Sequence, residues 1–173
     1  SKEVLKAVSL GKADLGIVDG DYSQRELLYL LFQRNQLVVI THPETELGQK
    51  ESCKFKDLLS YPLVGYNSES SLQQFIQRMS LLSHQSGSFR ANVPDFNSVA
   101  NLVSKNVGAA IVPKPLAERF KKRLEVQIVE LDEPWANREL HVCIRPPLER
   151  IPGQIEEQNL PALRLARYLA GVE

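Results

Sequence analysis

The most constraining feature of this sequence is a helical pattern that turns through glycine into a wholly apolar run, between Asp95 and Phe120. Apolar residues recur at helical spacing after Asp95, whose short side-chain acceptor can cap the first free backbone amides. The helix is predicted to end at residues 106–108, because asparagine tolerates and glycine prefers the left-handed conformation. Residues 109–112 are apolar and are halted by Pro113, which is typical of a strand buried on both faces. Helix, turn and buried strand make half of an α/β layer.

The same order of features occurs near the N-terminus, where a helical pattern stops at Gly11 and an apolar strand follows. Together with the strand and His-Pro pair at residues 37–43, these elements resemble the effector-binding domain of LysR-type transcriptional regulators. That family shows G-x-x-D-L-x-I, a hydrophobic strand followed by H-P, and L-V-x-x-G-x-G-I-x-x-x-P in this order. Here they are residues 11–17, 37–43 and 102–113. Asn106 stands where the family most often has glycine, and asparagine also tolerates the left-handed conformation.

The resemblance implies an α/β fold of the two-lobed type 2 periplasmic-binding-protein-like class, with mixed sheets flanked by helices. We expect residues 1–42 to form the first part of lobe one, 43–138 lobe two, and 139–173 the return to lobe one. In the family, a strand, helix and strand precede the first helix, so we expect an incomplete lobe one. Without that strand, backbone groups lose partners and apolar faces such as Ile17 and Val18 are uncovered, which predicts lower stability than for a longer chain.

Periodicity and turn residues predict the remaining elements. The run 26–41 is ambiguous between helix and strand, and we interpret it as two strands separated by a polar break at residues 33–36. The predicted strands are 13–18, 27–32, 37–41, 62–66, 89–93, 109–112, 124–131 and 140–144. The predicted helices are 1–10, 55–59, one beginning after Ser70 or Ser71, one after Asp95, and a last one that ends at Gly171.

Charge and cysteine usage exclude several classes of protein. The 173 residues include 21 lysines and arginines and 21 aspartates and glutamates, so the net charge is zero and direct binding of nucleic acid by this chain is not expected. No apolar run approaches the ~20 residues of a membrane span, and no signal-peptide pattern opens the sequence. Cys53 and Cys143 belong to no motif, which is typical of a reducing compartment. We therefore predict a cytoplasmic protein without a membrane partner.

The three histidines indicate neither a metal centre nor catalysis. His42, His84 and His141 have no metal-ligand spacing with one another, with a cysteine or with a carboxylate. No G-x-S-x-G element or phosphate-binding loop occurs. We predict no enzymatic activity, no metal and no cofactor.

A polar loop after the predicted strand 62–66 is the main candidate for ligand binding. In open α/β sheets, ligands gather at the carboxyl ends of strands, where the following helices direct free amides and a positive dipole end toward them. The loop and the end of the strand supply the candidate residues Tyr66, Asn67, Ser68, Ser70 and Ser71. Hydroxyls beside free amides suit a carboxylate, phosphate or sulfate, so the expected effector is an anion or a strongly polar acid.

Helix capping is the alternative role for these serines. Ser70 with Gln73, or Ser71 with Gln74, has the spacing of a capping box, so one serine is explained by capping alone. Asp95, Phe96 and Asn97 open another helix and are weaker candidates, because phenylalanine is more often a core residue. Ser1 is a candidate on the resemblance alone.

The resemblance implies an effector-sensing and oligomerising domain of a bacterial LysR-type regulator, working as a homodimer or tetramer. Operator DNA would be contacted only through the family's N-terminal winged helix-turn-helix, which this sequence lacks. A periplasmic solute-binding protein of a transport system is the alternative with the same fold. An enzyme on a similar scaffold is a third, against which the missing catalytic spacing counts. Sequence upstream of Ser1 would distinguish the first two.

Overall fold

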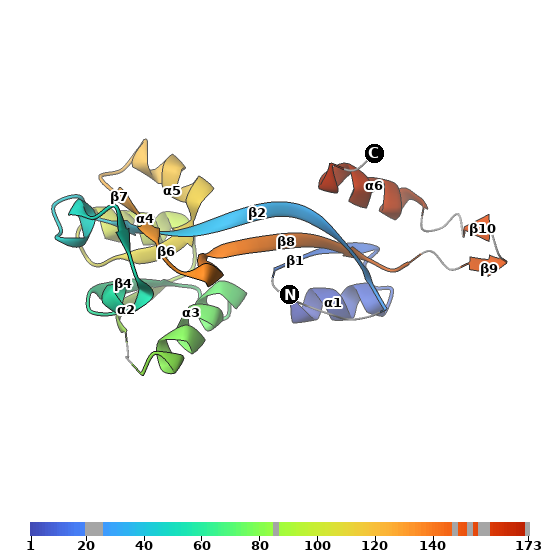
Figure 1. The fold of residues 1–173 in the computed structure, drawn as a ribbon, viewed down its shortest axis with the longest axis horizontal. Coiled ribbons are helices and arrows are strands. Elements are labelled where there is room, and N and C mark those ends of the chain that lie inside the picture. The colour runs from blue at the N-terminus through green and yellow to red at the C-terminus, as the bar shows by residue number, and fades with distance from the viewer. Residues whose placement is uncertain (20–25, 85–86, 147–148, 152–153, 156–159, 172–173) are drawn as a thin grey trace. The chain divides into compact units, whose positions relative to one another are not determined.

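The computed structural model describes residues 1–19, 26–84, 87–146, 149–151, 154–155 and 160–171. The chain divides into two compact units. Unit 1 consists of Ser1–Asn35 and Arg138–Glu173, and unit 2 of Gln36–Asn137 (Figure 1). The lobe boundaries expected from the resemblance, after residues 42 and 138, remain a prediction.

Unit 1 is built on strands flanked by helices. Its elements are α1 (Lys2–Ser9), β1 (Leu15–Asp19), the first part of β2 (Leu28–Thr41), β8 (Asn137–Ile144), β9 (Glu149–Ile151), β10 (Gln154–Ile155) and α6 (Leu160–Ala170). The strand order is β1-β8-β2, and β1 runs antiparallel to β8. Gly11 has a φ of +73° after α1, as the sequence predicts.

Two small apolar clusters hold unit 1 together. Leu140, Val142 and Ile144 alternate in the sequence with His141 and Cys143, yet Val142, Cys143 and Ile144 are all buried. Cys143 packs in a cluster with α1, while Val142 and Ile144 pack in another with Ala166 of α6. Successive strand residues point to opposite faces, so both faces of β8 are covered here.

The predicted break at residues 33–36 is wrong, because β2 is one strand of 14 residues. The polar side chains of Arg34 and Gln36 do not interrupt the strand, since they find charged partners beside it. Arg34 Nε lies 3.1 Å from Glu139 Oε1, and Gln36 Nε2 donates to Glu130 Oε2 at 2.6 Å. β2 therefore contributes its first part to unit 1 and its second part to unit 2.

Unit 2 is a mixed sheet with helices. Its further elements are β3 (Ser52–Cys53), α2 (Phe55–Leu58), β4 (Pro62–Tyr66), α3 (Ser71–Leu82), β5 (Ser88–Val93), α4 (Phe96–Ser104), β6 (Ala110–Pro113), α5 (Lys114–Lys121), β7 (Gln127–Leu131), and the short 3-10 helices η1 (Leu47–Gln49) and η2 (Pro134–Ala136). β2 lies between β6 and β7 and is antiparallel to both, and β3 pairs with β7. β4 pairs in parallel with β5 and touches β6 through one parallel bridge, between Leu63 and Ala109.

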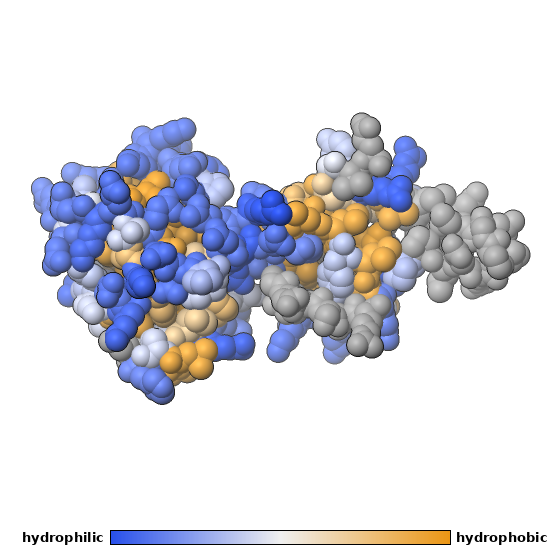
Figure 2. Space-filling model, viewed as in Figure 1, coloured by the Kyte–Doolittle hydropathy of each residue, from blue (hydrophilic) through white to orange (hydrophobic). Residues whose placement is uncertain are grey.

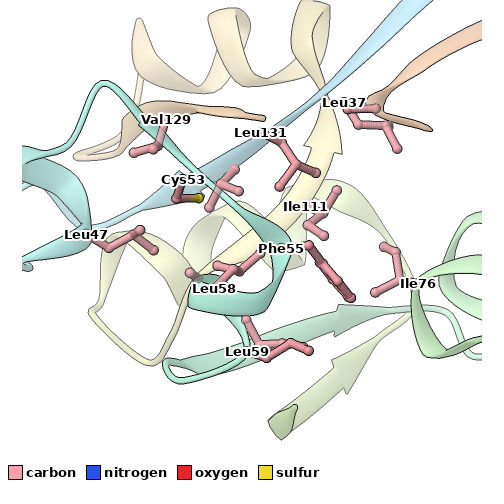
Figure 3. Close-up of a cluster of buried hydrophobic side chains, with 14 residues drawn as sticks. Leu37, Leu47, Cys53, Phe55, Leu58, Leu59, Ile76, Ile111, Val129 and Leu131 are labelled. Atoms are coloured by element: carbon pink, nitrogen blue, oxygen red, sulfur yellow. The ribbon is translucent and has the colours of Figure 1, made fainter. Parts of the chain in front are cut away.

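Two large clusters fill unit 2. One contains fourteen described buried residues, among them Leu58 and Ile111 (Figure 3). The other contains eleven and lies beneath α4 and α5. Helix α5 is missing from the sequence prediction, which stopped at Pro113, although proline is tolerated in a first helical turn and Phe120 supplies an apolar anchor.

The turn after α4 uses its two special residues differently from the prediction. Asn106 takes the left-handed conformation, with a φ of 57°, and Gly108 does not. Gly108 instead lets two chain segments approach closely, because a Cβ there would lie 2.6 Å from the carbonyl oxygen of Pro62. This approach brings the segment before β6 beside the start of β4, where Ala109 N donates to Pro62 O at 2.8 Å.

Candidate ligand-binding site

The carboxyl ends of β4 and β5 lie side by side in unit 2. The two strands are parallel, with Tyr66 opposite Val93, and Asn67 N donates to Val93 O at 2.9 Å just beyond the paired residues. Each strand leads into a helix, α3 after β4 and α4 after β5. Two helix N-termini therefore start from the same end of the sheet, which is where α/β proteins bind ligands.

Ser70 caps helix α3, and this settles which serine has that role. Its hydroxyl oxygen accepts a hydrogen bond from Gln73 N at 3.1 Å. A tight turn leads into the cap, because Ser70 N donates to Asn67 O at 2.8 Å and Glu69 N to Asn67 Oδ1 at 3.1 Å. Ser71 is the first residue of the helix, is exposed, and forms no hydrogen bond with the described residues through its hydroxyl. The Ser71 hydroxyl is thus available to a ligand.

Helix α4 begins with its own carboxylate in place. Asp95 Oδ1 accepts from Ser98 N at 2.9 Å and Oδ2 from Ser98 Oγ at 2.7 Å. The bond from the Ser98 hydroxyl, with that from its backbone amide, lowers the pKa of the Asp95 carboxyl. Since this carboxylate already occupies the positive end of α4, the start of α3 is the better place for a further negative group.

An aromatic pair joins the two helix starts. The rings of Tyr66 and Phe96 are stacked, with centroids 4.0 Å apart and an interplanar angle of 15°. Both side chains are half-buried and pack against the cluster beneath α4. Phe96 therefore packs against the core, as the sequence favoured. The exposed part of the aromatic pair adds an apolar surface beside the polar loop residues.

Most of the predicted site residues lie at this end of unit 2. Tyr66, Asn67, Ser68, Ser70 and Ser71 form one segment, and Asp95, Phe96 and Asn97 form the other. Ser68 and Asn97 are exposed.

Ser1 belongs to unit 1. Its hydroxyl oxygen accepts from Asp19 N at 3.2 Å and forms no cap for α1.

Gln73 is a residue of this site that the sequence prediction missed. The capping-box spacing was noted, but in such a box the glutamine side chain returns to the backbone of the capping residue. Here Gln73 Oε1 accepts instead from Tyr66 N, at 3.1 Å. The sequence signal was a glutamine three positions after the capping serine, and only the position of β4 shows where its side chain goes.

The histidines and cysteines stay outside this site. Within the described ranges, no group of three histidine, cysteine or acidic residues could hold a metal ion. Cys53 and Cys143 are free thiols. Burial raises the pKa of Cys53 to about 11 and also raises that of Cys143, so both thiols are protonated at neutral pH.

No helix among the described residues is long and apolar enough to cross a membrane.

Mixed sheets flanked by helices place the chain in the class of periplasmic-binding-protein-like α/β domains. The family model of the LysR substrate binding domain matches residues 1–153, so the chain belongs to that family. It is the effector-binding domain of a LysR-type regulator rather than a transport protein. Comparison with curated proteins gives no match.

Solved regulatory domains share the fold. The CcmR regulatory domain of Synechocystis PCC6803, in complex with 2-PG, is similar with a TM-score of 0.74 and 18% identity, over 98% of this chain and 77% of that chain. The MetR (NMB2055) regulatory domain from N. meningitidis has a TM-score of 0.76 and 15% identity, over 96% and 72%. The effector binding domain of QuiR in complex with shikimate has a TM-score of 0.68 and 19% identity, over 98% and 76%.

Proposed function

We propose that this domain senses a small polar acid, bound at the start of α3 beside the Tyr66–Phe96 pair. The observation that carries the proposal is the uncommitted hydroxyl of Ser71, exposed in the first turn of a helix whose cap is already supplied by Ser70. Free amides and the positive end of the helix dipole favour a negative group there. The aromatic pair supplies contact area for the apolar part of the ligand.

The expected ligand class agrees with those bound by relatives of the same fold. The CcmR domain is in complex with 2-PG and the QuiR domain with shikimate. No metal or cofactor is required for binding of this kind, and no catalysis is proposed. Asn67, Ser68, Asp95 and Asn97 lie in the segments that begin α3 and α4 and are further candidate hydrogen-bonding groups. Ser1, which belongs to unit 1, stays a prediction from the resemblance.

Sensing works by a shift of population. A ligand that binds one conformation of the regulator more tightly than another favours that conformation, and its effect is bounded by the difference in affinity. We infer that the domain acts as a homodimer or tetramer, and that operator DNA is contacted by a separate N-terminal winged helix-turn-helix. With a net charge of zero, this chain alone should give no sequence-selective retardation of DNA in gel shifts at low salt. The regulator would act in the cytoplasm, where the two thiols stay reduced.

Calorimetric titration of the regulator with small acids tests the site. Shikimate, 2-PG and other carboxylates and phosphates form the panel. With an acid that binds, Ser71→Ala should weaken affinity by roughly ten- to a hundredfold, because a hydrogen bond to a charged group is lost. Ser71→Asp should weaken it further, since the new carboxylate repels an anion.

Ser83→Ala provides the matched control, because Ser83 lies at the other end of the same helix and its hydroxyl donates to Ser80 O. This variant should bind like the unsubstituted regulator. Unchanged affinity in both Ser71 variants would exclude the start of α3 as the ligand site.

A further inference from the structure

Gln73 holds both ends of the proposed ligand loop, residues 66–71. Its backbone amide donates to the Ser70 hydroxyl at 3.1 Å, and its side-chain Oε1 accepts from Tyr66 N at 3.1 Å. The residue is 2% exposed, which is unusual for glutamine. One buried residue therefore binds the end of β4 through its side chain and the capping serine of α3 through its backbone.

The other half of the Gln73 amide is unpaired. Nε2 is buried and has no hydrogen-bond partner among the described residues. Exchanging the positions of Oε1 and Nε2 would still leave a polar group unpaired, because Tyr66 N–H needs an acceptor and only Oε1 can accept. A buried donor without a partner costs free energy, so Nε2 indicates a polar occupant that is not a protein side chain.

The surrounding strands supply further polar groups. β4 and β6 are bridged only at Leu63 and Ala109 among the described residues, where Val64 N donates to Ala109 O. Backbone groups of a strand alternate in direction, so Ile111 turns its N–H and C=O to the same side as Ala109, toward β4. In a continued ladder Tyr66 N would donate to Ile111 O. Gln73 Oε1 takes that position instead.

A small cavity lies where the two strands separate. Its volume is about 10 Å³, and Gln73 is the polar side chain in a lining otherwise formed by apolar residues of α3, β4, β5 and the 109–111 segment. This space suits one water molecule, provided that the water finds two or more polar partners. Gln73 and Ile111 both line the cavity, so Gln73 Nε2 and the backbone of Ile111 are the partners expected for such a water.

We propose that Gln73 is a positioning residue which, with one water molecule bound in this cavity, holds loop 66–71 in the shape that the ligand requires. The proposal rests on the function proposed above. The glutamine fixes the ends of the loop, and the water completes the hydrogen bonds of its amide across the gap between β4 and β6. The Ser71 hydroxyl and the Tyr66 ring then stand in fixed positions before a ligand arrives.

Hydrogen exchange measured by mass spectrometry on the regulator tests the role of the amide oxygen. Gln73→Met keeps the size of the side chain and removes both polar groups, so exchange of the Tyr66 amide should accelerate by roughly tenfold or more. Gln73→Glu at pH 5 should stay close to the unsubstituted chain, because a buried glutamic acid is protonated and keeps both an acceptor and a donor. Gln77→Met, on the exposed side of α3, is the control and should change nothing.

Unchanged exchange in Gln73→Met, or equal acceleration in both Gln73 variants, would overturn the positioning role. A crystal structure at a resolution that shows ordered water should contain one water within hydrogen-bonding distance of Nε2, and an empty gap would overturn that part. These readouts need no ligand. If they hold while no acid of the panel binds, the ligand site fails and the role of Gln73 in shaping the loop stands. If shikimate or 2-PG binds, Gln73→Met should weaken it and Gln77→Met should not.

Discussion

Units 1 and 2 are both built from strands flanked by helices, yet they bury very different numbers of apolar side chains. Among the described residues, the clusters of unit 2 contain fourteen and eleven buried members, and those of unit 1 contain five and three. Burial of apolar area stabilises at about 25 cal/mol per Å². Unit 2 therefore has the larger source of stability, and it contains the proposed ligand loop, residues 66–71.

The exposed apolar side chains show the same contrast from the outside. Most of the large exposed hydrophobic residues described belong to unit 1: Leu10, Ile17, Leu28, Leu31, Leu165 and Tyr168. Figure 2 shows apolar atoms gathered on the surface of this unit. Sheet and helix faces of this kind favour contact with another chain or segment, which agrees with the self-association proposed for the domain.

A core substitution in unit 2 should have the largest effect. Leu58 is fully buried in the fourteen-residue cluster, so Leu58→Ala should lower the free energy of unfolding of unit 2 by about 2–5 kcal/mol. The single tryptophan, Trp135, contacts Phe55 and Phe75 in this unit, and its fluorescence during urea unfolding reports on unit 2 alone.

Leu81→Ala is the matched control, because Leu81 is 76% exposed. It should change stability by less than about 0.5 kcal/mol. If the two leucine variants lost the same stability, the fourteen-residue cluster would not be the main support of unit 2.

The rates at which the two free thiols are modified report on the opening of each unit, because Cys143 lies in unit 1 and Cys53 in unit 2. In rising urea at pH 8, Cys143 should be modified first, with a rate roughly tenfold or more above that of Cys53, since the smaller clusters open more easily. Burial raises the pKa of the Cys53 thiol from 9.0 in the unfolded chain to about 11 in the folded chain, so the protonated thiol contributes to stability below pH 9.0. This contribution is lost as the pH rises from 9.0 to about 11. The experiment at pH 8 avoids that loss. Equal rates would show that the units open together.

Substituting the serines that precede α3 and α1 should give a smaller difference in stability between the units. Ser70→Ala removes a capping hydrogen bond and should destabilise unit 2 by about 1 kcal/mol. Ser1 has no capping bond, and its hydroxyl makes two long contacts with the Asp19 backbone, accepting from Asp19 N at 3.2 Å and donating to Asp19 O at 3.5 Å. Ser1→Ala should therefore cost unit 1 about 0.5 kcal/mol. Trp135 fluorescence and Cys143 labelling measure the two units separately. A larger loss for Ser1→Ala would reverse the comparison.

Lowering the pH should have the smallest effect on stability, and this effect should arise at the start of α4. Because the pKa of the Asp95 carboxyl is lowered from 3.8, its stabilising contribution is present above pH 3.8 and is lost as the pH falls through the lowered value. Carbon NMR titration of this carboxyl should show that Ser98→Ala moves the pKa back toward 3.8. No change in the titration would mean that the Ser98 hydroxyl does not hold the carboxylate in solution.

Local signals were sufficient for much of unit 2. The cap at Asp95, the strand at Pro62–Tyr66 and the apolar stripe of α3 all depend on neighbours a few positions away, and they lie where the sequence predicts. The α/β class and the family were likewise predictable, since three spaced motifs had to occur in one order.

The remaining features depend on distant partners. The choice between serines 70 and 71 is the exception, because both have capping-box spacing and a local turn through Asn67 decides between them. The path of the Gln73 side chain depends on the end of β4. The continuity of β2 depends on partners that follow much later in the chain, among them Glu130 and Glu139. Periodicity within one segment contains none of this information.

The long strand β2 also has a consequence for synthesis of the protein. Its apolar residues 37–41 meet their partners late, since Val39 pairs with Ile111 and Val129. At about 5–20 residues per second, the ribosome needs roughly 4–14 s to extend the chain from Val39 to Ile111. During that interval an uncharged, strongly β-forming segment is without its native neighbours, which is the composition that pairs with other nascent chains.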